Sequence, residues 1–261
     1  MKPEWLREIW QYRELFYFLV WRDVKVRYKQ TVLGAAWAVI QPFFSMVVFT
    51  LFFQRLANMP SDGIPYPIFS YSALIPWIYF STAIATAGNS LVANSNLLTK
   101  VYFPRVAVPA SSAFGGIVDF AIASVVLLAI MAYYRFPPAW SLLLWPVLVI
   151  PLVALALGVG MFLAALNVRY RDIRYALPFF IQTWLFVTPI IYPTSIIPEK
   201  FRVLIFLNPL AGIIEGFRAC VFPRREMDWT LLDVSILITA IIFIVGALYF
   251  RKTERTFADL V

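Results

Sequence analysis

Long apolar stretches, separated by short segments that hold most of the charge, constrain this chain more than any other feature. An α-helix needs about 20 apolar residues to cross the hydrocarbon core of a bilayer. With 62% hydrophobic and only 14% charged residues, the chain lacks the charged shell of a soluble domain. The sequence predicts an all-α integral membrane protein with six transmembrane helices, over residues 33–53, 66–93, 106–133, 140–166, 176–192 and 231–250.

The basic residues predict the orientation of these spans. Of the 22 Lys and Arg residues, 15 lie before the first span, after the second and fourth spans, or in the C-terminal tail. Cytoplasmic flanks carry an excess of such residues, so both termini are expected in the cytoplasm. The net charge of +8 is explained in this way, and no basic run stands clear of the apolar segments. Nucleic acid is therefore not an expected partner.

Several kinds of chemistry lack their residues. The chain has no histidine and one cysteine, Cys220, which excludes an intramolecular disulfide, a histidine base and the usual zinc or haem ligand sets. No G-x-x-x-x-G-K-[ST] motif is present, so the chain has no P-loop for ATP. We expect no catalytic residue, metal or cofactor on this chain. If it is driven by ATP, then ATP and Mg²⁺ belong to a separate partner ATPase.

The first 30 residues form a cytoplasmic flank ahead of the transmembrane domain 31–261, and no cleavable signal is expected in them. They predict an amphipathic interfacial helix, because an apolar stripe follows helical spacing: Trp5, Ile9, Tyr12, Phe16 and Leu19. The alternative is a helix packed on the body of the protein. Four basic residues beside the first span favour contact with anionic lipid headgroups or act only as topology signals: Arg22, Lys25, Arg27 and Lys29.

Two cytoplasmic loops are candidate contact surfaces. The loop 94–105 combines apolar and basic side chains, and its candidate docking residues are Leu97, Leu98, Lys100, Val101, Tyr102, Phe103 and Arg105. The alternative is that these groups dip into the bilayer interface. The loop 167–175 holds three arginines, which indicate a topology determinant or a patch for anionic lipid or a partner.

The segment 193–230 is unusual among the connections. It holds two apolar stretches too short or too polar to span comfortably, around Phe201–Leu207 and Leu210–Val221, separated by Asn208-Pro209. Such lengths predict external re-entrant or interfacial helices between spans five and six.

Features inside the spans add structural and functional expectations. Asp119 in span three is costly in hydrocarbon and suggests function or pairing. Gln41-Pro42 is expected to kink span one, and Ala156, Gly160 and Ala164 predict close helix contact in span four. Aromatic rings in spans one and five could pack on sugar rings and line a channel, or could face lipid and the core: Trp37, Phe43, Phe44, Trp184 and Phe186.

Taken in order, several of these segments resemble one known family. The segments Leu98–Arg105, Asn167–Ile173 and Pro189–Pro193, with Asn208-Pro209, resemble type-2 ABC exporter permeases. Within that family they are most similar to the polysaccharide group, the Wzm-type O-antigen permeases and their capsule and teichoic-acid relatives. The resemblance covers nearly the whole chain.

The resemblance implies a homodimer with two copies of a nucleotide-binding ATPase subunit. It implies export of a glycan linked to undecaprenyl pyrophosphate across a bacterial inner membrane. It also implies that the loop 94–105 is the coupling loop that docks the ATPase and that the segment 193–230 lies near the exit. The Arg22–Lys29 region matches the entry side. Open alternatives are a capsule or teichoic-acid exporter, an exporter of small lipophilic drugs, a membrane-embedded glycan or lipid transferase, and a scaffold without transport. The lack of a histidine base argues against the transferase.

Overall fold

A computed structural model describes residues 11–29, 34–95, 103–170, 172–222, 226–254 and 257. All regular structure in these ranges is helical, as predicted. The helices are α2 (Arg13–Lys29), α3 (Trp37–Phe49), α4 (Tyr66–Ala93), α6 (Ala107–Gly115), α7 (Ile117–Tyr133), α8 (Trp145–Arg169), α9 (Ile173–Val187), α10 (Glu199–Leu207), α11 (Pro209–Val221) and α12 (Trp229–Glu254). Three shorter pieces extend them: η1 (Gly34–Ala36), η2 (Thr50–Leu56) and η3 (Trp140–Leu144). A fourth, η4 (Thr194–Ile196), lies in the connection between α9 and α10.

Five helical segments in the described ranges are long and apolar enough to cross a bilayer. They match the first four predicted spans and the last: Gly34–Leu56, Tyr66–Ala93, Ala107–Tyr133, Trp140–Arg169 and Trp229–Glu254. The predicted fifth span is shorter than expected. The 15 residues of α9 extend about 22 Å, against about 30 Å of hydrocarbon. The helix ends at Val187 because Pro189 favours an extended Thr188, which has φ −91° and ψ 138°.

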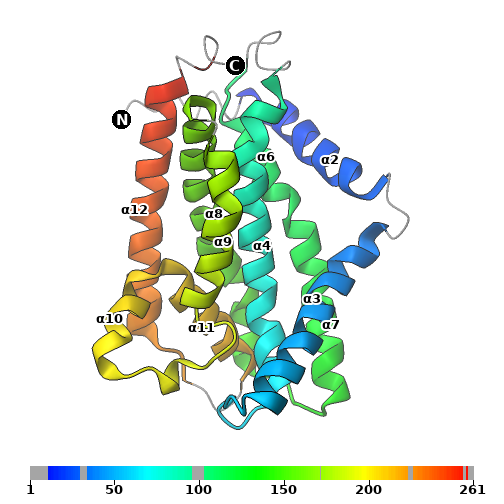
Figure 1. The fold of residues 1–261 in the computed structure, drawn as a ribbon. Helices are drawn as coiled ribbons and strands as arrows, with labels where there is room; N and C mark the ends of the chain where they lie inside the picture. Colours follow the sequence, from blue (N-terminus) through cyan, green and yellow to red (C-terminus); the bar gives the residue numbers. More distant parts are fainter. Residues whose placement is uncertain are drawn as a thin grey trace.

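The direction of the chain still favours α9 as a crossing. The start of α2 and the end of α12 lie at one end of the bundle, which we call the terminal end (Figure 1). The helix α8 arrives at the terminal end, and α12 starts at the opposite end. The chain must return between them, and α9 runs back alongside α4 and α8. Six crossings therefore stay our prediction.

Small residues allow the long helices to approach closely. A methyl group at Gly158 of α8 would lie 2.7 Å from the Cα of Phe243 on α12. One at Gly160 would lie 2.8 Å from the Cβ of Ala87 on α4. Ala156 and Ala164 are fully buried, so the predicted small-residue stripe of span four is confirmed as a close contact. The helix α3 continues through Pro42 and gives way to π-helix at Thr50, so the kink expected at this proline stays a prediction.

The helix α4 is the most deeply buried span, and α11 is buried along its entire length. The helices α10 and α11 meet at an angle of 98° around Asn208. Both lie at the end of the bundle opposite the terminal end (Figure 1). This geometry agrees with the two short apolar helices expected from the sequence, while their external, re-entrant placement stays a prediction.

Candidate functional site

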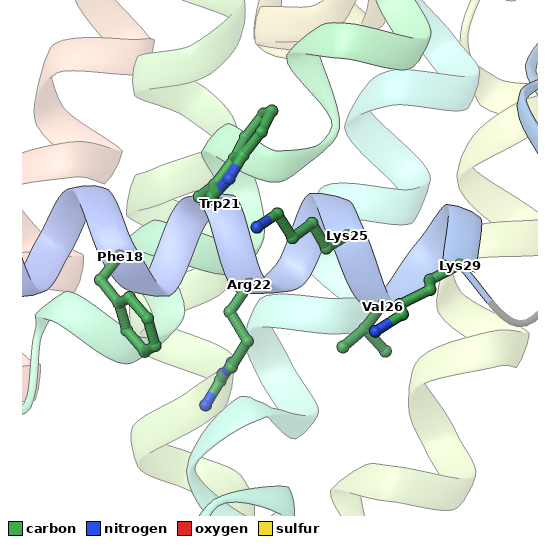
Figure 2. A pocket seen from close by; sticks show the side chains of 6 residues that line it. All are labelled: Phe18, Trp21, Arg22, Lys25, Val26 and Lys29. Atoms are coloured by element: carbon green, nitrogen blue, oxygen red, sulfur yellow. The ribbon is translucent and has the colours of Figure 1, made fainter.

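The outward side of α2 carries a shallow groove of 330 Å³. All of its lining residues come from this helix (Figure 2): Phe18, Trp21, Arg22, Lys25, Val26 and Lys29. They form rows with a spacing of four residues, because an α-helix repeats about every 3.6 residues. Three of the four basic residues singled out in the sequence are therefore brought to one surface, which we call the outer groove.

The outer groove combines positive charge with exposed apolar rings. The Nζ atom of Lys25 lies 5.3 Å from the centroid of the Trp21 ring. Arg22 lies 2.8 Å from Asp23, Nη2 to Oδ1, so part of its charge is already matched. Exposed Lys25 and Lys29 carry the remaining charge. Such a mixture suits the headgroup layer of a membrane, where aromatic rings and cations meet anionic lipids.

The fourth basic residue, Arg27, lies on the opposite side of α2. Its guanidinium forms an ion pair with Asp119 on α7, and the hydroxyl of Tyr28 donates a hydrogen bond to the same carboxylate. Arg27 is thus separated from the other three basic residues in this structure, and a headgroup role for it stays a prediction. The sequence left open whether Asp119 is paired, and the structure shows its carboxylate paired with the N-terminal helix.

A second contact extends this inner surface of α2. The Ser111 hydroxyl on α6 donates a hydrogen bond of 3.1 Å to Asp23. Burial, followed by the hydrogen bond to Asp119 and its charge, raises the pKa of Tyr28 to about 12, so its phenol stays protonated at neutral pH. We call these five residues the inner cluster: Asp23, Arg27, Tyr28, Ser111 and Asp119.

The apolar stripe predicted on the N-terminal helix also faces inward. Leu19 is buried, and Tyr12 and Phe16 pack beside it in the cluster that contains Val108 and Phe250. Trp5 and Ile9 lie outside the described residues. The expectation that this stripe meets lipid is therefore wrong for its described part. The exposed apolar side chains of α2 belong to other positions: Tyr17, Phe18, Trp21 and Val26.

The coupling loop is only partly described. Leu97, Leu98, Lys100, Val101 and Tyr102 lie outside the described residues. Phe103 is buried in the cluster with Leu91 and Phe250. The backbone N–H of Arg105 donates a hydrogen bond of 3.1 Å to the carboxylate of Glu254, at the end of α12. A docking role for Phe103 and Arg105 stays a prediction, and both have neighbours within the chain.

The predicted channel residues divide into exposed and anchored ones. Trp37, Phe43 and Phe44 on α3 and Phe186 on α9 are exposed. Trp37 and Phe44 share a shallow depression of 560 Å³ on α3 with Ile40, Gln41, Ser45, Val48 and Phe49. Trp184 is half-buried, since its ring packs edge-on against Phe80 at 5.1 Å and its Nε1–H donates to Asn208 at 3.1 Å. In this structure, Trp184 contributes to packing within the chain, and its role in a channel wall stays a prediction.

A partly exposed polar stripe on α4 was not predicted. It consists of Ser81, Thr82, Thr86 and Asn89, spaced for one helix face. The hydroxyls of Ser81 and Thr86 donate to carbonyls of their own helix at 3.1 and 2.8 Å, so their oxygen lone pairs remain as acceptors. Such a stripe can accept hydrogen bonds from a ligand rich in hydroxyl groups.

A buried ionic cluster at the end opposite the terminal end was also missed. Arg218 is fully buried on α11, 2.8 Å from Glu215, Nη1 to Oε1. Its Nη2 donates to the carbonyl of Ile190 at 2.6 Å, and its guanidinium stacks 3.8 Å from the centroid of the Phe69 ring. Tyr66 donates to the next carbonyl, that of Ile191, at 2.8 Å. These contacts fix the non-helical chain that follows α9.

Comparison with known proteins places these surfaces in a family. A model of the ABC-2 type transporter family matches residues 14–222, from α2 to the end of α11. The chain belongs to this family.

Several bacterial export and transport proteins are similar to this ABC-2 type transporter over almost their whole length. The O-antigen export system permease protein RfbA of Myxococcus xanthus is 29% identical over 258 residues, covering 97% of this chain and 98% of that protein. An RfbA protein of Klebsiella pneumoniae is 28% identical over 241 residues, 92% of either chain. The polysialic acid transport protein KpsM of Escherichia coli is 22% identical over 239 residues, 90% and 91% of the two chains.

Two signals in the sequence of this transporter could have found the missed residues. Glu215 and Arg218 are three positions apart in an otherwise apolar stretch, where opposite charges meet on one helix face. The hydroxyl and amide residues of α4 recur at helical spacing inside a span. No comparable local signal links Arg27 to Asp119, since 92 positions separate them.

Proposed function

We propose that this chain is the channel-forming permease subunit of an ABC exporter that moves a lipid-linked polysaccharide of the O-antigen type across the bacterial inner membrane. The observation that carries the proposal is similarity over nearly the full length to two export permeases named for O-antigen. Similarity to a polysialic acid transport protein supports the broader class, polysaccharide export. The chain itself does no covalent chemistry in this proposal.

The working unit is a homodimer with two ATPase subunits. ATP and Mg²⁺ bind to the ATPase subunits, and this chain binds no cofactor. The loop 94–105 receives their motion on the cytoplasmic side, where both termini also lie. The exposed apolar residues of α3 and α9 support a second copy as partner, because a large uncovered apolar face needs lipid or protein against it.

The outer groove is the entry surface for the carrier headgroup. A pyrophosphate carries negative charge, and each basic residue near a membrane surface contributes about 1 kcal/mol of attraction to anionic headgroups. Lys25, Lys29 and the partly matched Arg22 supply that attraction. The neighbouring Phe18, Trp21 and Val26 offer an apolar surface to the lipid chain.

The wall of the channel combines rings with hydrogen-bond acceptors. A polymer has to slide through many equivalent positions, so no single contact should hold it strongly. The exposed rings of Trp37, Phe44 and Phe186 offer flat faces to sugar C–H groups, and they fix no hydrogen-bond pattern. The hydroxyls of the α4 stripe add weak acceptors for sugar hydroxyls.

The proposal is tested with inverted membrane vesicles that contain the permease and its ATPase. ATP-driven uptake of polyprenyl-pyrophosphate-linked glycan is measured for short and long chains. Phe44→Ala with Phe186→Ala should slow long chains several-fold more than short ones and leave basal ATP hydrolysis intact. The exposed residue Leu128 on α7 provides the matched control, Leu128→Ala. Uptake of a lipophilic dye without glycan uptake would favour a drug exporter, and equal slowing of all lengths would contradict the wall.

A further inference from the structure

The rotation of α2 about its own axis decides which of its basic residues face outward. At about 100° per residue, Arg27 points about 200° away from Lys25 and about 140° away from Arg22. If Arg27 is held inward, the outer groove keeps its three cations outward. A half-turn of the helix would bring Arg27 out and remove Lys25 and Lys29 from the surface.

The contacts that fix this rotation converge on one carboxylate. Asp119 accepts from both Arg27 and Tyr28, in the last turns of α2. Earlier on the helix, Leu19 and Val24 are buried by apolar packing. Beyond Val24 the inner surface of α2 turns polar, and there the ionic contacts replace the apolar ones.

The inner cluster also bridges an interruption in the third span. The helices α6 and α7 are separated at Gly116, and Ser111 lies before the break while Asp119 lies after it. Asp23 contacts α6 and Arg27 contacts α7, so α2 spans the break and connects the two helices. Phe16 packs edge-on against Phe114 at 5.6 Å and adds to the contact with α6. The orientation of α2 is therefore tied to the helix that directly follows the coupling loop.

We propose that Asp119 is a positioning residue for headgroup capture: by holding Arg27 and Tyr28 inward, it presents Arg22, Lys25 and Lys29 to the carrier headgroup. This role rests on the proposed function, because the outer groove is its headgroup site. An ion pair of this kind is well suited to the task, since a carboxylate in a span is costly unless it is paired and therefore favours one orientation of the helix. Because Arg27 is paired with Asp119, it does not compete with the basic residues of the outer groove for the headgroup.

The first arm of the test reads the orientation of α2 without any substrate. Single cysteines replace Val26, which is exposed, or Val24, which is buried. Reaction with a polar maleimide in nanodiscs should be at least ten times faster at position 26 than at position 24. Asp119→Asn should reduce that ratio several-fold, and Asp119→Glu should largely retain it. An unchanged ratio in Asp119→Asn would overturn the proposal.

The second arm reads capture of the headgroup. Nanodiscs with a polyprenyl pyrophosphate are titrated against the permease–ATPase complex, and half-saturation of the ATPase response is measured. Asp119→Asn should raise the half-saturating concentration about three- to ten-fold with little change in the maximal rate, and the exchange Arg27→Asp with Asp119→Arg should restore it. Glu199→Gln, an exposed carboxylate at the other end of the bundle, is the control. A fall in the maximal rate alone, without a shift in half-saturation, would contradict the proposal.

The two arms separate the positioning role from the proposed function. Charge removal at Lys25 and Lys29 with no shift in half-saturation contradicts the headgroup site, and with it the capture role of Asp119. If the labelling ratio nevertheless changes in Asp119→Asn, Asp119 still sets the orientation of α2 but has no role in headgroup capture. If Asp119→Asn yields unfolded protein, Arg27→Gln is used instead, because it removes the ion pair and leaves the carboxylate bonded to Tyr28.

Discussion

Two ion pairs of this protein differ in how completely protein covers them. The Arg218–Glu215 pair joins neighbouring turns of one helix and is almost completely buried, with side chains 0% and 7% exposed. The Arg27–Asp119 pair joins two helices that are far apart in the sequence, and its side chains are 28% and 27% exposed. Protein therefore encloses the first pair and leaves part of the second uncovered. We expect the Arg218–Glu215 pair to be the more rigid of the two.

The surroundings of the two pairs differ in the same sense. Arg218 also donates to the Ile190 carbonyl, at a place where the chain has left its helix and needs partners for its backbone. Asn208 adds a hydrogen bond of 3.0 Å to Thr188 in that region. Asp119 instead accepts from two side chains of α2, so it connects two helices and supports no backbone group directly.

The largest effect is expected for Arg218→Met. It leaves the Glu215 carboxylate buried without its cation and removes the donor to Ile190. Breaking a buried pair in this way costs about 3–5 kcal/mol. Thermal unfolding of the detergent-solubilised protein should show a large loss of stability, whereas Lys200→Met, at an exposed position on α10, should show little.

A double variant sharpens this result. Arg218→Met with Glu215→Gln removes both charges, so part of the lost stability should return. Equal stability of the wild type and Arg218→Met would show that the pair is not what holds the chain after α9.

The sequence predicted the spans well, because their signal is local. Long apolar stretches fix the first four spans and the last one, and the small residues of span four fix its close contact with α4. The end of α9 was misplaced, since apolar composition continues through residues 188–192 while Pro189 stops the helix. Local composition records hydrophobicity there, and the backbone constraint of one proline overrides it.

The candidate site was harder to predict, because it depends on which way each helix turns. The sequence identified the four basic residues beside the first span as one group and did not show that they face different ways. Only a contact 92 positions away, at Asp119, turns Arg27 inward. The apolar stripe of the N-terminal helix was likewise read as lipid-facing, although amphipathicity alone does not distinguish a bilayer from a protein surface. The burial of Phe103 could not be predicted either, since an apolar residue in a loop can be exposed or buried.

A smaller effect on stability is expected for Asp119→Asn. Protein encloses this pair only in part, and the amide oxygen that replaces the carboxylate can still accept from Tyr28. We expect a loss of about 1–2 kcal/mol, between the values of surface and buried pairs. Unfolding measured alongside Arg218→Met checks the order of the two effects. A larger loss for Asp119→Asn than for Arg218→Met would reverse the comparison between the two pairs.

The smallest effect is expected for Tyr28→Phe, which removes one hydrogen bond and leaves the Arg27–Asp119 pair in place. A single hydrogen bond contributes about 0.5–1.5 kcal/mol, or somewhat more with a charged acceptor. This contribution should depend on pH in a specific window. Folding favours the protonated phenol, whose pKa rises from 10.0 to about 12. The resulting stabilisation is complete below pH 10 and is lost as the pH rises from about 10 to 12.

Comparison of two variants isolates this window from the titration of the other tyrosines. Stability is measured from pH 7 to the alkaline limit of the folded protein for the wild type and for Tyr28→Phe, and the difference between them is plotted against pH. The difference should be constant to about pH 10 and then shrink. Tyr17→Phe, at an exposed position on the same helix, should show no difference at any pH in this range. A difference that shrinks well below pH 10 would mean that the Tyr28 phenol is not held protonated beside Asp119. The contact of Asp119 with α2 would then depend on Arg27 alone, and Asp23 with Ser111 would be the second connection in the inner cluster.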